Sequence, residues 1–481
     1  MGFFGGVTEG RRLPKTMEAL LTGDARNEDD LNLARVLLYK EIIFLTGKPI
    51  EFTGLIEVGG TNGVTPNTTS GQYSLQLTVY PSTSSGDIAI NRTAVFNIRY
   101  RVEGNQLIKD YTLQDWNERI TIADLEYTLD TEQSAFDISI IEHNAPSITY
   151  YRGDVSSRAV FMSNTNEMLI QDSADSFYGY NCAWSAIETH RMDSTITANN
   201  WQTQFQIRPS VSINKALQYK DNEPDVIGFE GNYKEVLHRD AGLKYDILQV
   251  PLIYPDQPRT GETSFNLRNT FEQLIAPDLV YLRGHPAFED IAKLFSMQIL
   301  DGDPKLYQPD QAITRAQFIT ALTKAIKLPV QTVASETRGR RAQTPPIIFP
   351  DVLPSRPDYP YIMSAYRNGV AFGRDFGTFY ADAPLQRQEA FTVLVRSLGL
   401  TNLGLPDSRI FTDDEKIAWW ARTDLAAGVR LGLIKPDGEG QIKPGEYLSK
   451  AEAASLLRNF VDYLRFGIKT DYAEHLVNYV T

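Results

Sequence analysis

The chain has 481 residues, a formal net charge of −13 at pH 7, 42% hydrophobic residues and 11% aromatic residues. The hydrophobic content is typical of packed globular domains and excludes wholesale disorder. The acidic balance excludes nucleic acid as the main partner, because no basic excess is available to neutralise phosphates. At about 100–200 residues per domain, the length predicts three or four domains.

Cysteine usage and hydropathy exclude further classes. A single cysteine, Cys182, cannot form an internal disulfide framework or a cysteine-ligated zinc site. No run approaches the roughly 20 apolar residues that span a bilayer, so membrane insertion is not expected. The N-terminus lacks the basic segment followed by an apolar core that marks a secretory signal. Starting from Met1, the chain is expected to reach a surface by another route.

Residues 1–47 are predicted to form an N-terminal arm and a helix. Apolar residues recur there at roughly helical spacing, at Leu31, Val36, Leu38, Ile42 and Leu45. The first dozen residues are rich in glycine and carry Phe3 and Phe4. Two interpretations stay open for them, a frayed terminus or an arm that docks on a neighbouring subunit.

Residues 48–145 and 146–275 are predicted to form two antiparallel β-sandwich-like modules. In segments such as 72–81 and 93–102, apolar and polar residues alternate, as in strands with one buried face and one wet face. Clusters of glycine, asparagine and serine separate these segments, and a break at Asn144–Pro146 marks the boundary between the modules.

Residues 276–481 are predicted to be helical and to contain one motif three times, at about 276–330, 345–400 and 408–465, with a further helix after the third copy. Each copy has a helix, a polar or glycine turn, a short extended piece and a second helix. Repeats of this size usually bury their apolar faces against one another, so the three copies form one domain. The expected fold class is therefore α+β multidomain: an N-terminal helical segment, two β-sandwich-like modules and an all-α triple helix-turn-helix domain.

The second helix of each copy is predicted to begin at a basic residue, namely Arg315, Arg387 and Lys450. Thr314 and Ser449 precede two of these residues as N-caps, with a glutamine or glutamate three positions later as in a capping box. The second copy has Gln386 in the cap position, so its cap is expected to differ.

The order of these parts resembles the S-layer homology family. The third copy has "FTDD", Trp420–Ala421 and "SKAE", and the second has "FPDV", "FGTFYADAPL" and Arg387. The first copy keeps "YQPDQAITRAQF" but has "HPAFED" where the opening element should be. The resemblance covers roughly residues 278–467, which is under half of the chain. It implies a three-pronged helical unit whose grooves bind anionic, often pyruvylated, cell-wall polysaccharides.

The same resemblance implies a set of ligand-binding residues. Basic side chains at the helix starts would meet acidic sugar groups, glycines would let the backbone approach the ligand, and a tryptophan would line a groove. These residues are Arg315, Arg387, Lys450, Gly377, Gly438, Trp419 and Trp420. The alternative stays open that the cations only complete local salt bridges and caps.

No other chemistry is indicated. The five histidines are scattered, and the chain has no G-x-S-x-G, P-loop or dinucleotide-binding pattern, so no enzyme is expected. No cofactor is predicted. Two acidic turns, at 301–304 and 436–440, could contribute to calcium sites, but neither has the ligand spacing of a complete loop, and structural turns are favoured.

The sequence predicts a structural, self-assembling subunit of a bacterial surface layer, sheath, filament or spore outer layer. Its expected place is the cell or spore surface. Its expected partners are other copies of itself, contacted through Phe3 and Phe4 and through sheet edges, and an anionic cell-wall polysaccharide. The alternative is a monomeric, wall-anchored protein whose β modules bind a carbohydrate or another surface.

Overall fold

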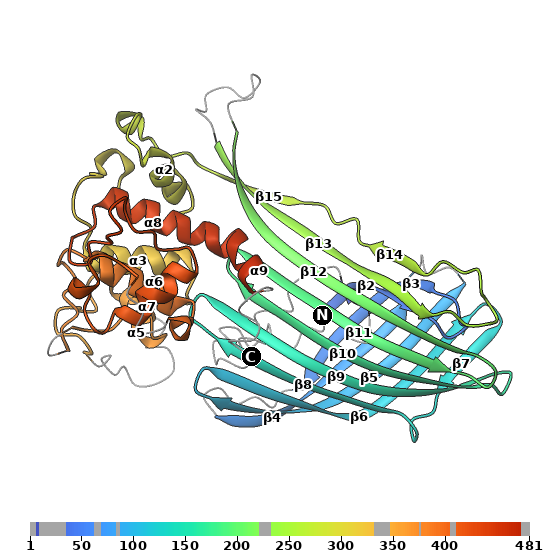
Figure 1. Ribbon diagram of the computed structural model, residues 1–481. Helices are drawn as coiled ribbons and strands as arrows, with labels where there is room; N and C mark the ends of the chain where they lie inside the picture. Colours follow the sequence, from blue (N-terminus) through green and yellow to red (C-terminus); the bar gives the residue numbers. More distant parts are fainter. Residues whose placement is uncertain are drawn as a thin grey trace.

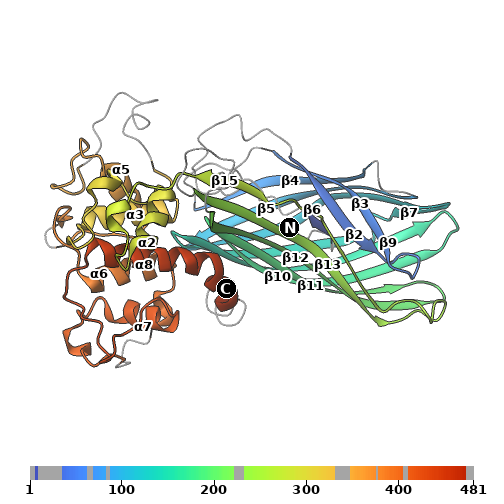
Figure 2. The same ribbon diagram turned by 90° about the horizontal axis from the view of Figure 1, so that it is seen from above.

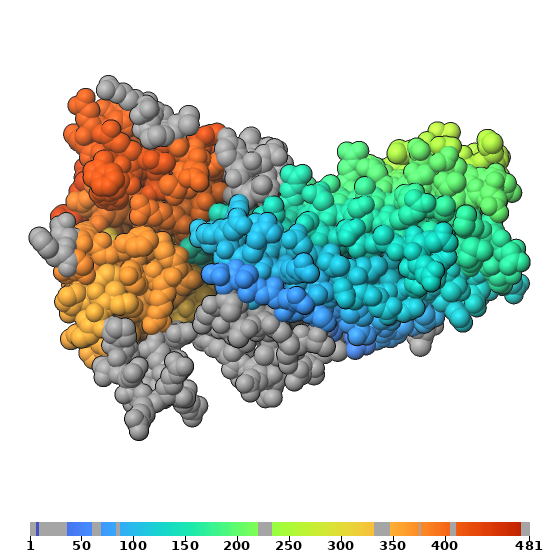
Figure 3. Space-filling view, turned by 90° about the horizontal axis from the view of Figure 1, so that it is seen from below, coloured from blue at the N-terminus to red at the C-terminus, as the bar shows by residue number. Residues whose placement is uncertain are grey.

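The computed structural model describes residues 6–8, 35–61, 69–82, 87–220, 232–330, 347–374, 377–404 and 410–472. A long antiparallel sheet occupies the N-terminal half of the chain, and a group of short helices lies at one end of it (Figure 1). Seen from below, the two parts form one elongated body (Figure 3).

One sheet contains all the strands that the structure describes. They are β1 (Val7–Thr8), β2 (Arg35–Ile43), β3 (Ile50–Thr61), β4 (Ser70–Pro81), β5 (Ile88–Glu103), β6 (Gln106–Ile122), β7 (Leu125–Leu129), β8 (Ala135–Asn144), β9 (Ile148–Ser163), β10 (Met168–Cys182), β11 (Ser185–Thr197), β12 (Gln202–Lys220), β13 (Asn232–Gln249), β14 (Thr260–Ser264) and β15 (Thr270–Leu274).

Neighbouring strands in the chain are almost always neighbours in the sheet. The order runs from β1 to β7 and then from β9 to β14, and each pair is antiparallel. Two pairs of shorter strands each occupy a single place in the strand order. β7 and β8 both lie between β6 and β9, at opposite ends of these strands. β14 and β15 pair with opposite ends of β13. The sheet is therefore a meander with few long-range crossings.

The sheet curves until its first strands lie behind its last ones (Figures 1 and 2). The ring of Phe44, just after β2, stacks on Phe205 of β12 with centroids 3.9 Å apart. Across the same closure, Lys40 Nζ of β2 donates to Thr263 Oγ1 of β14 at 3.0 Å. The inward side chains of both regions share one hydrophobic core, while alternate residues face outward.

The interior of the sheet also holds paired charges. Arg92 on β5 contacts Glu41 on β2 at 2.9 Å and Glu118 on β6 at 2.5 Å. His190 on β11 contacts Asp175 on β10 at 2.7 Å and Glu188 at 3.0 Å. All six side chains are buried, so each charge needs its partner to offset the loss of water.

The expected fold class is wrong for the N-terminal half of the chain, whose described residues form strands and no helix. Arg35–Ile43, inside the predicted helix, is strand β2, and Leu37, Tyr39 and Glu41 face inward while Val36 and Leu38 are exposed. The apolar residues at 36, 38, 42 and 45 fit a helical period only if the alternation at 37, 39 and 41 is overlooked. The first part of that predicted segment lies outside the described residues.

A single sheet takes the place of the two predicted sandwich modules. The break at Asn144–Pro146 is a tight turn, because β8 and β9 on either side of it pair with each other over ten residue pairs, from Ala135–Arg158 to Asn144–Thr149. A turn sequence marks the end of a strand, but it does not reveal whether the next strand joins the same sheet.

The helices that the structure describes lie in the C-terminal half, where each repeat contributes two longer ones (Figure 2). They are α2 (Phe288–Ser296), α3 (Arg315–Ala325), α5 (Tyr359–Arg367), α6 (Arg387–Ser397), α7 (Arg422–Arg430) and α8 (Lys450–Asp462). Shorter elements are η3 (Val280–Leu282), η4 (Pro304–Leu306), η6 (Thr401–Leu403), η7 (Asp414–Lys416), the π-helical η8 (Tyr463–Gly467) and α9 (Ile468–Asp471). None of the described helices has the length and apolar character needed to cross a membrane.

The sheet and the repeats share a continuous core. The Trp184 indole N–H donates to the carbonyl of Ala325 at 2.7 Å, and the Ser147 N–H donates to the carbonyl of Ser397 at 2.8 Å. Tyr472, which follows α9, is fully buried among tyrosines of β9 and β10. The end of the sheet is therefore one wall of the helical core.

Candidate functional site

The three repeats meet in a closed ring of backbone hydrogen bonds. The Ile313 N–H donates to the carbonyl of Leu448 (2.9 Å), the Leu448 N–H to Leu385 (3.0 Å), and the Leu385 N–H to Ile313 (3.0 Å). The three residues occupy equivalent positions just before α3, α6 and α8, and all are buried. The ring gives the repeats a pseudo-threefold arrangement.

The ring brings each basic residue against the next repeat. The N–H groups of Arg315, Arg387 and Lys450 donate to the carbonyls of Ala383, Glu446 and Gln311, respectively, at 2.8–2.9 Å. Each of the three predicted cations therefore lies at a boundary between two repeats. The boundaries differ in what surrounds the cation.

Arg315 is almost completely enclosed between the first and second repeats, with 6% of its surface exposed. Its guanidinium contacts Glu389 Oε1 at 2.9 Å and the Phe372 carbonyl at 2.6 Å, and it lies 4.9 Å from the ring centre of Phe379. Arg374 pairs with the same glutamate. Burial lowers the pKa of Arg315, and the charge of Glu389 opposes that shift. The Arg315 guanidinium therefore already has partners within the protein.

Arg387 lies between the second and third repeats and is partly exposed. Its Nε donates to the Ile442 carbonyl at 2.9 Å, and one terminal nitrogen contacts Glu452 Oε1 at 3.0 Å. Glu452 is the capping glutamate of α8. This cation too is neutralised by a carboxylate of the next repeat.

Lys450 lies between the third and first repeats and has a neutral partner. Its Nζ donates to Gln311 Oε1 at 2.6 Å, and it lies 5.8 Å from the ring centre of Tyr307. Among the described residues, no carboxylate lies within salt-bridge distance of this ammonium. Partial burial lowers the pKa of Lys450. The capping partner at the start of α3 is Gln317, where the other repeats have glutamate.

A surface hollow of about 770 Å³ adjoins this third boundary. Its lining includes aromatic rings and hydrogen-bonding groups from the first repeat, namely Tyr281, Leu282, Arg283, His285, Tyr307, Gln308, Pro309, Asp310 and Gln311. The Tyr307 hydroxyl donates to the Lys450 carbonyl at 3.0 Å, which links the hollow to the start of α8. We call the hollow and Lys450 together the third groove.

The other predicted ligand residues lie away from the third groove. Trp419 is 84% exposed just before α7, whereas Trp420 packs partly against a separate core of the third repeat. Gly377 has a φ of +75°, which favours glycine. Gly438 lies in an exposed turn and has no atom near the place of a Cβ. Phe3 and Phe4 lie outside the described residues.

Sequence reasoning missed the residues that hold the loops beside the boundaries between repeats. The Asp351 carboxylate accepts the N–H groups of Phe379 (2.8 Å) and Ala381 (3.0 Å). In the third repeat, Asp413 accepts those of Ile442 (3.1 Å) and Lys443 (2.8 Å). These are the aspartates of "FPDV" and "FTDD", so the repeated F-x-D pattern could have revealed them.

The first repeat fixes the corresponding loop with a tyrosine. The Tyr281 hydroxyl lies 2.8 Å from the Pro304 carbonyl oxygen and 2.6 Å from that of Tyr307. The first copy, which lacks the F-x-D element, thus holds this loop through a hydroxyl donor instead of a carboxylate acceptor. It also places the Tyr281 ring in the wall of the third groove.

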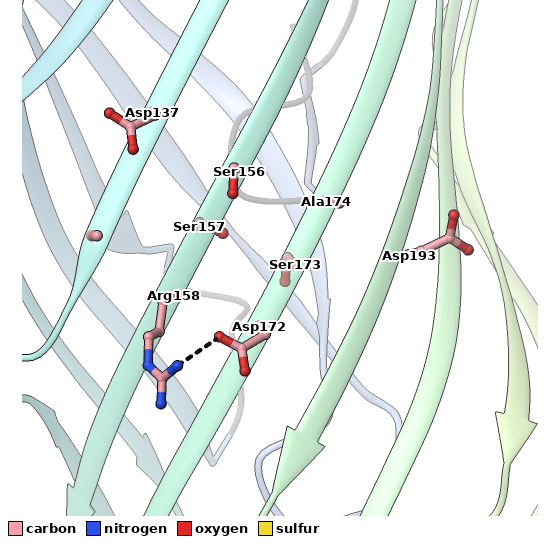
Figure 4. Close-up of a pocket in the computed structure, with 9 residues that line it drawn as sticks. Asp137, Ser156, Ser157, Arg158, Asp172, Ser173, Ala174 and Asp193 are labelled. Carbon is pink, nitrogen blue, oxygen red and sulfur yellow. Dashed lines mark ion pairs between the residues drawn. The ribbon is translucent and has the colours of Figure 1, made fainter.

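A second, smaller hollow of about 370 Å³ lies on the outer face of the sheet. Small side chains form its floor, and Asp137, Arg158, Asp172 and Asp193 surround it (Figure 4). Arg158 and Asp172 are 3.7 Å apart. Within the described part of the chain, no group of three histidine, cysteine or acidic residues is arranged to hold a metal ion.

Comparisons with known proteins agree with the geometry of the repeats. The model of the S-layer homology domain matches residues 282–319, 348–391 and 410–454. A surface-layer 125 kDa protein of Lysinibacillus sphaericus is 25% identical over 192 residues, which are 39% of this chain and 15% of that protein.

Two enzymes match to a similar extent. An amylopullulanase of Thermoanaerobacterium thermosulfurigenes is 24% identical over 179 residues, 36% of this chain and 9% of that protein. An exoglucanase XynX of Acetivibrio thermocellus is 24% identical over 179 residues, 36% of this chain and 15% of that protein. The chain thus spans only a small part of each relative, and the matches run through the repeats alone.

The prediction made from the repeated motif is therefore confirmed. S-layer homology domains imply binding to the cell-wall polymer and a place at the cell surface. The chain carries three S-layer homology domains within residues 282–454.

Proposed function

We propose that the protein is a structural, self-assembling subunit of a bacterial surface layer or a related outer coat. In this proposal it acts without catalysis, and its repeats attach it to an anionic wall polysaccharide. The observation that carries the attachment is the third groove, where Lys450 has no carboxylate partner in the described part of the chain, unlike Arg315 and Arg387.

The chemistry of the third groove suits an acidic sugar. A lysine ammonium with only an amide partner can exchange that contact for a carboxylate, which makes a stronger, charge-assisted hydrogen bond. The rings of Tyr281 and Tyr307 offer apolar surface to a sugar face, and Arg283 and Gln311 add donors. The other two cations would first have to give up Glu389 or Glu452.

The test is binding to purified wall polymer, measured by co-sedimentation. Lys450→Gln is expected to weaken binding about tenfold, the usual cost of one charge-assisted contact. Lys450→Arg keeps the charge and is expected to retain most of the binding. The control is Lys293→Gln, which removes a surface cation of α2 that is already paired with Glu289. Equal binding by the Lys450→Gln and Lys293→Gln variants would refute a role for the third groove.

Assembly is supported by the elongated shape of the protein and by the core that the sheet shares with the repeats. A long sheet that shares a core with the wall-binding repeats has a fixed direction relative to them, as a lattice subunit needs. The test is electron microscopy of the full-length protein beside a Phe3→Ser/Phe4→Ser variant. We expect ordered sheets or fibres from the unchanged protein and their loss in the variant. Ordered arrays from both proteins would remove the two phenylalanines from the assembly contact.

A monomeric, wall-anchored binding protein is the second candidate. It is favoured by the hollow on the outer face of the sheet, where Asp137, Asp172 and Asp193 offer acceptors and Arg158 offers donors (Figure 4). Such a set of polar groups suits hydroxyl-rich ligands. Dispersed single particles in the same micrographs, under every condition, would favour this candidate over assembly.

A further inference from the structure

Three cations surround one buried indole where the sheet meets the repeats. Trp184, between β10 and β11, lies 4.5 Å from the guanidinium of Arg465, 5.0 Å from the ammonium of Lys327 and 5.9 Å from that of Lys215. The three basic residues come from η8, the end of the first repeat and β12. We call these four residues the junction cluster.

Two of the three cations in the junction cluster have a carboxylate within salt-bridge distance. Lys215 pairs with Glu235 at 3.1 Å, and Arg465 lies 3.6 Å from Asp462. Lys327 makes no salt bridge within the described part of the chain. Cation–π attraction to the Trp184 ring offsets some of the repulsion, but such a contact is weaker than a carboxylate partner.

Two further observations point to a missing anion. Burial and the adjacent ammonium of Lys215 lower the pKa of Lys327 to about 8, and the nearby carboxylates of Glu235 and Glu272 oppose this shift only in part. The Nε of Arg465 is buried and has no hydrogen-bond partner among the described residues, although only 4% of the Arg465 side chain is exposed. A buried donor of this kind is costly unless something accepts from it.

We propose that the junction cluster binds an oxyanion, a phosphate or carboxylate group, between Lys215 and Lys327. Lys327 is exposed, so the group can arrive from solvent. A bound oxyanion separates the two ammonium groups with opposite charge and gives the guanidinium of Arg465 a nearby acceptor. Because the cations belong to three elements, the anion ties β12, the first repeat and the segment after α8 together.

This site is separate from the third groove. It lies where the sheet meets the repeats, on residues that do not line the hollow beside Lys450. Its anion has two sources, a free ion or an acidic group on the wall polymer, and the chemistry of recognition is the same for both. The experiment therefore has one arm for each source.

The experiment measures thermal unfolding of the full chain with inorganic phosphate, or with acidic wall-polymer fragments. Sodium chloride of equal ionic strength is the reference in both arms, since general screening must be separated from binding. A ligand that binds only the folded state raises the midpoint. The variant is Lys327→Gln. The matched control is Lys324→Gln, which removes a cation that contacts Tyr361 at 4.9 Å but already has Asp301 as a partner.

We expect phosphate to raise the midpoint of the unchanged protein and of Lys324→Gln, with at least about tenfold weaker affinity in Lys327→Gln by calorimetry. That result assigns the site to a free oxyanion. A response to the polymer fragments alone, lost in Lys327→Gln, assigns it to an acidic group of the polymer. Responses that Lys327→Gln leaves unchanged in both arms, or that are absent in both, overturn the proposal.

Discussion

The buried histidine of the sheet has two carboxylates within hydrogen-bonding distance. His190 contacts Asp175 and Glu188, stacks on Phe177 with centroids 4.8 Å apart, and shares Glu188 with the Tyr151 hydroxyl. Burial opposes the charged imidazole, but these carboxylates outweigh it and raise the pKa of His190 to about 9. The imidazolium is therefore part of the folded structure at neutral pH.

This arrangement predicts a fall in stability at alkaline pH. The folded pKa of His190 lies above its unfolded value of about 6.5, so the stabilisation is complete below pH 6.5 and is lost as the pH rises towards 9. We expect the free energy of unfolding to fall by about 3 kcal/mol over this range. Urea titrations at several pH values measure it.

The control for this prediction is a second histidine of the same sheet. His190→Gln is expected to be less stable and to lack the alkaline decline, whereas His238→Gln on β13 should keep the decline of the unchanged protein. A His190→Gln variant with the same pH slope as the unchanged protein would show that other groups cause it.

The basic residues of the repeats show how much of the candidate site can be predicted from the sequence. The repeated motif predicts that Arg315, Arg387 and Lys450 begin helices at equivalent places, and the structure has α3, α6 and α8 beginning there. It does not predict which of them is free for a ligand. That depends on Glu389, Glu452 and Gln311, which come from other repeats and meet the cations only in the folded molecule.

At the scale of elements, single aspartates fix the loops at the boundaries between repeats. Asp413 is 6% exposed and accepts two backbone N–H groups at the extended segment before α8. Without it, these donors lie near the core of the third repeat with no acceptor. Asp413, 37 positions before Lys450 in the chain, therefore holds the loop that leads into α8.

We predict that Asp413→Ala lowers the free energy of unfolding by about 2–3 kcal/mol, because two hydrogen bonds to a charged acceptor are lost. Asp413→Asn keeps one acceptor oxygen and should lose less. Glu415→Ala, an exposed neighbour, is the control and should change stability by about 0.5 kcal/mol or less. Chemical denaturation compares the three variants, and similar losses for Asp413→Ala and Glu415→Ala would contradict this role of the aspartate.

The strand β2 shows why element type was mistaken at the N-terminal end. Its sequence places apolar residues on both faces, at Leu37 and Tyr39 inside and at Val36 and Leu38 outside. A strand with two apolar faces gives no clean alternation, so a helical period can be fitted to part of it. Strands such as β5, with a regular inside–outside pattern, were predicted correctly as strands.

At the scale of the whole molecule, the repeats were predictable and the sheet architecture was not. A motif that recurs three times specifies local structure and also implies contacts between copies, here the ring through Ile313, Leu385 and Leu448. Alternating strands specify only that a sheet exists. The number of strands that join one sheet depends on twist and curvature summed over the whole sheet. The contact between Phe44 and Phe205, where the sheet closes, depends on the same sum.

The shared core at the junction has a mechanical consequence. Third-repeat helix α8 continues through η8 and α9 to Tyr472, which is fixed among the tyrosines of β9 and β10. Tension on a polymer held beside Lys450 would pass along the continuous helical segment from α8 to α9. It would reach the long antiparallel strands at the end of the sheet. The long strands would then carry the tension, and the fold would set the angle between the wall and the sheet.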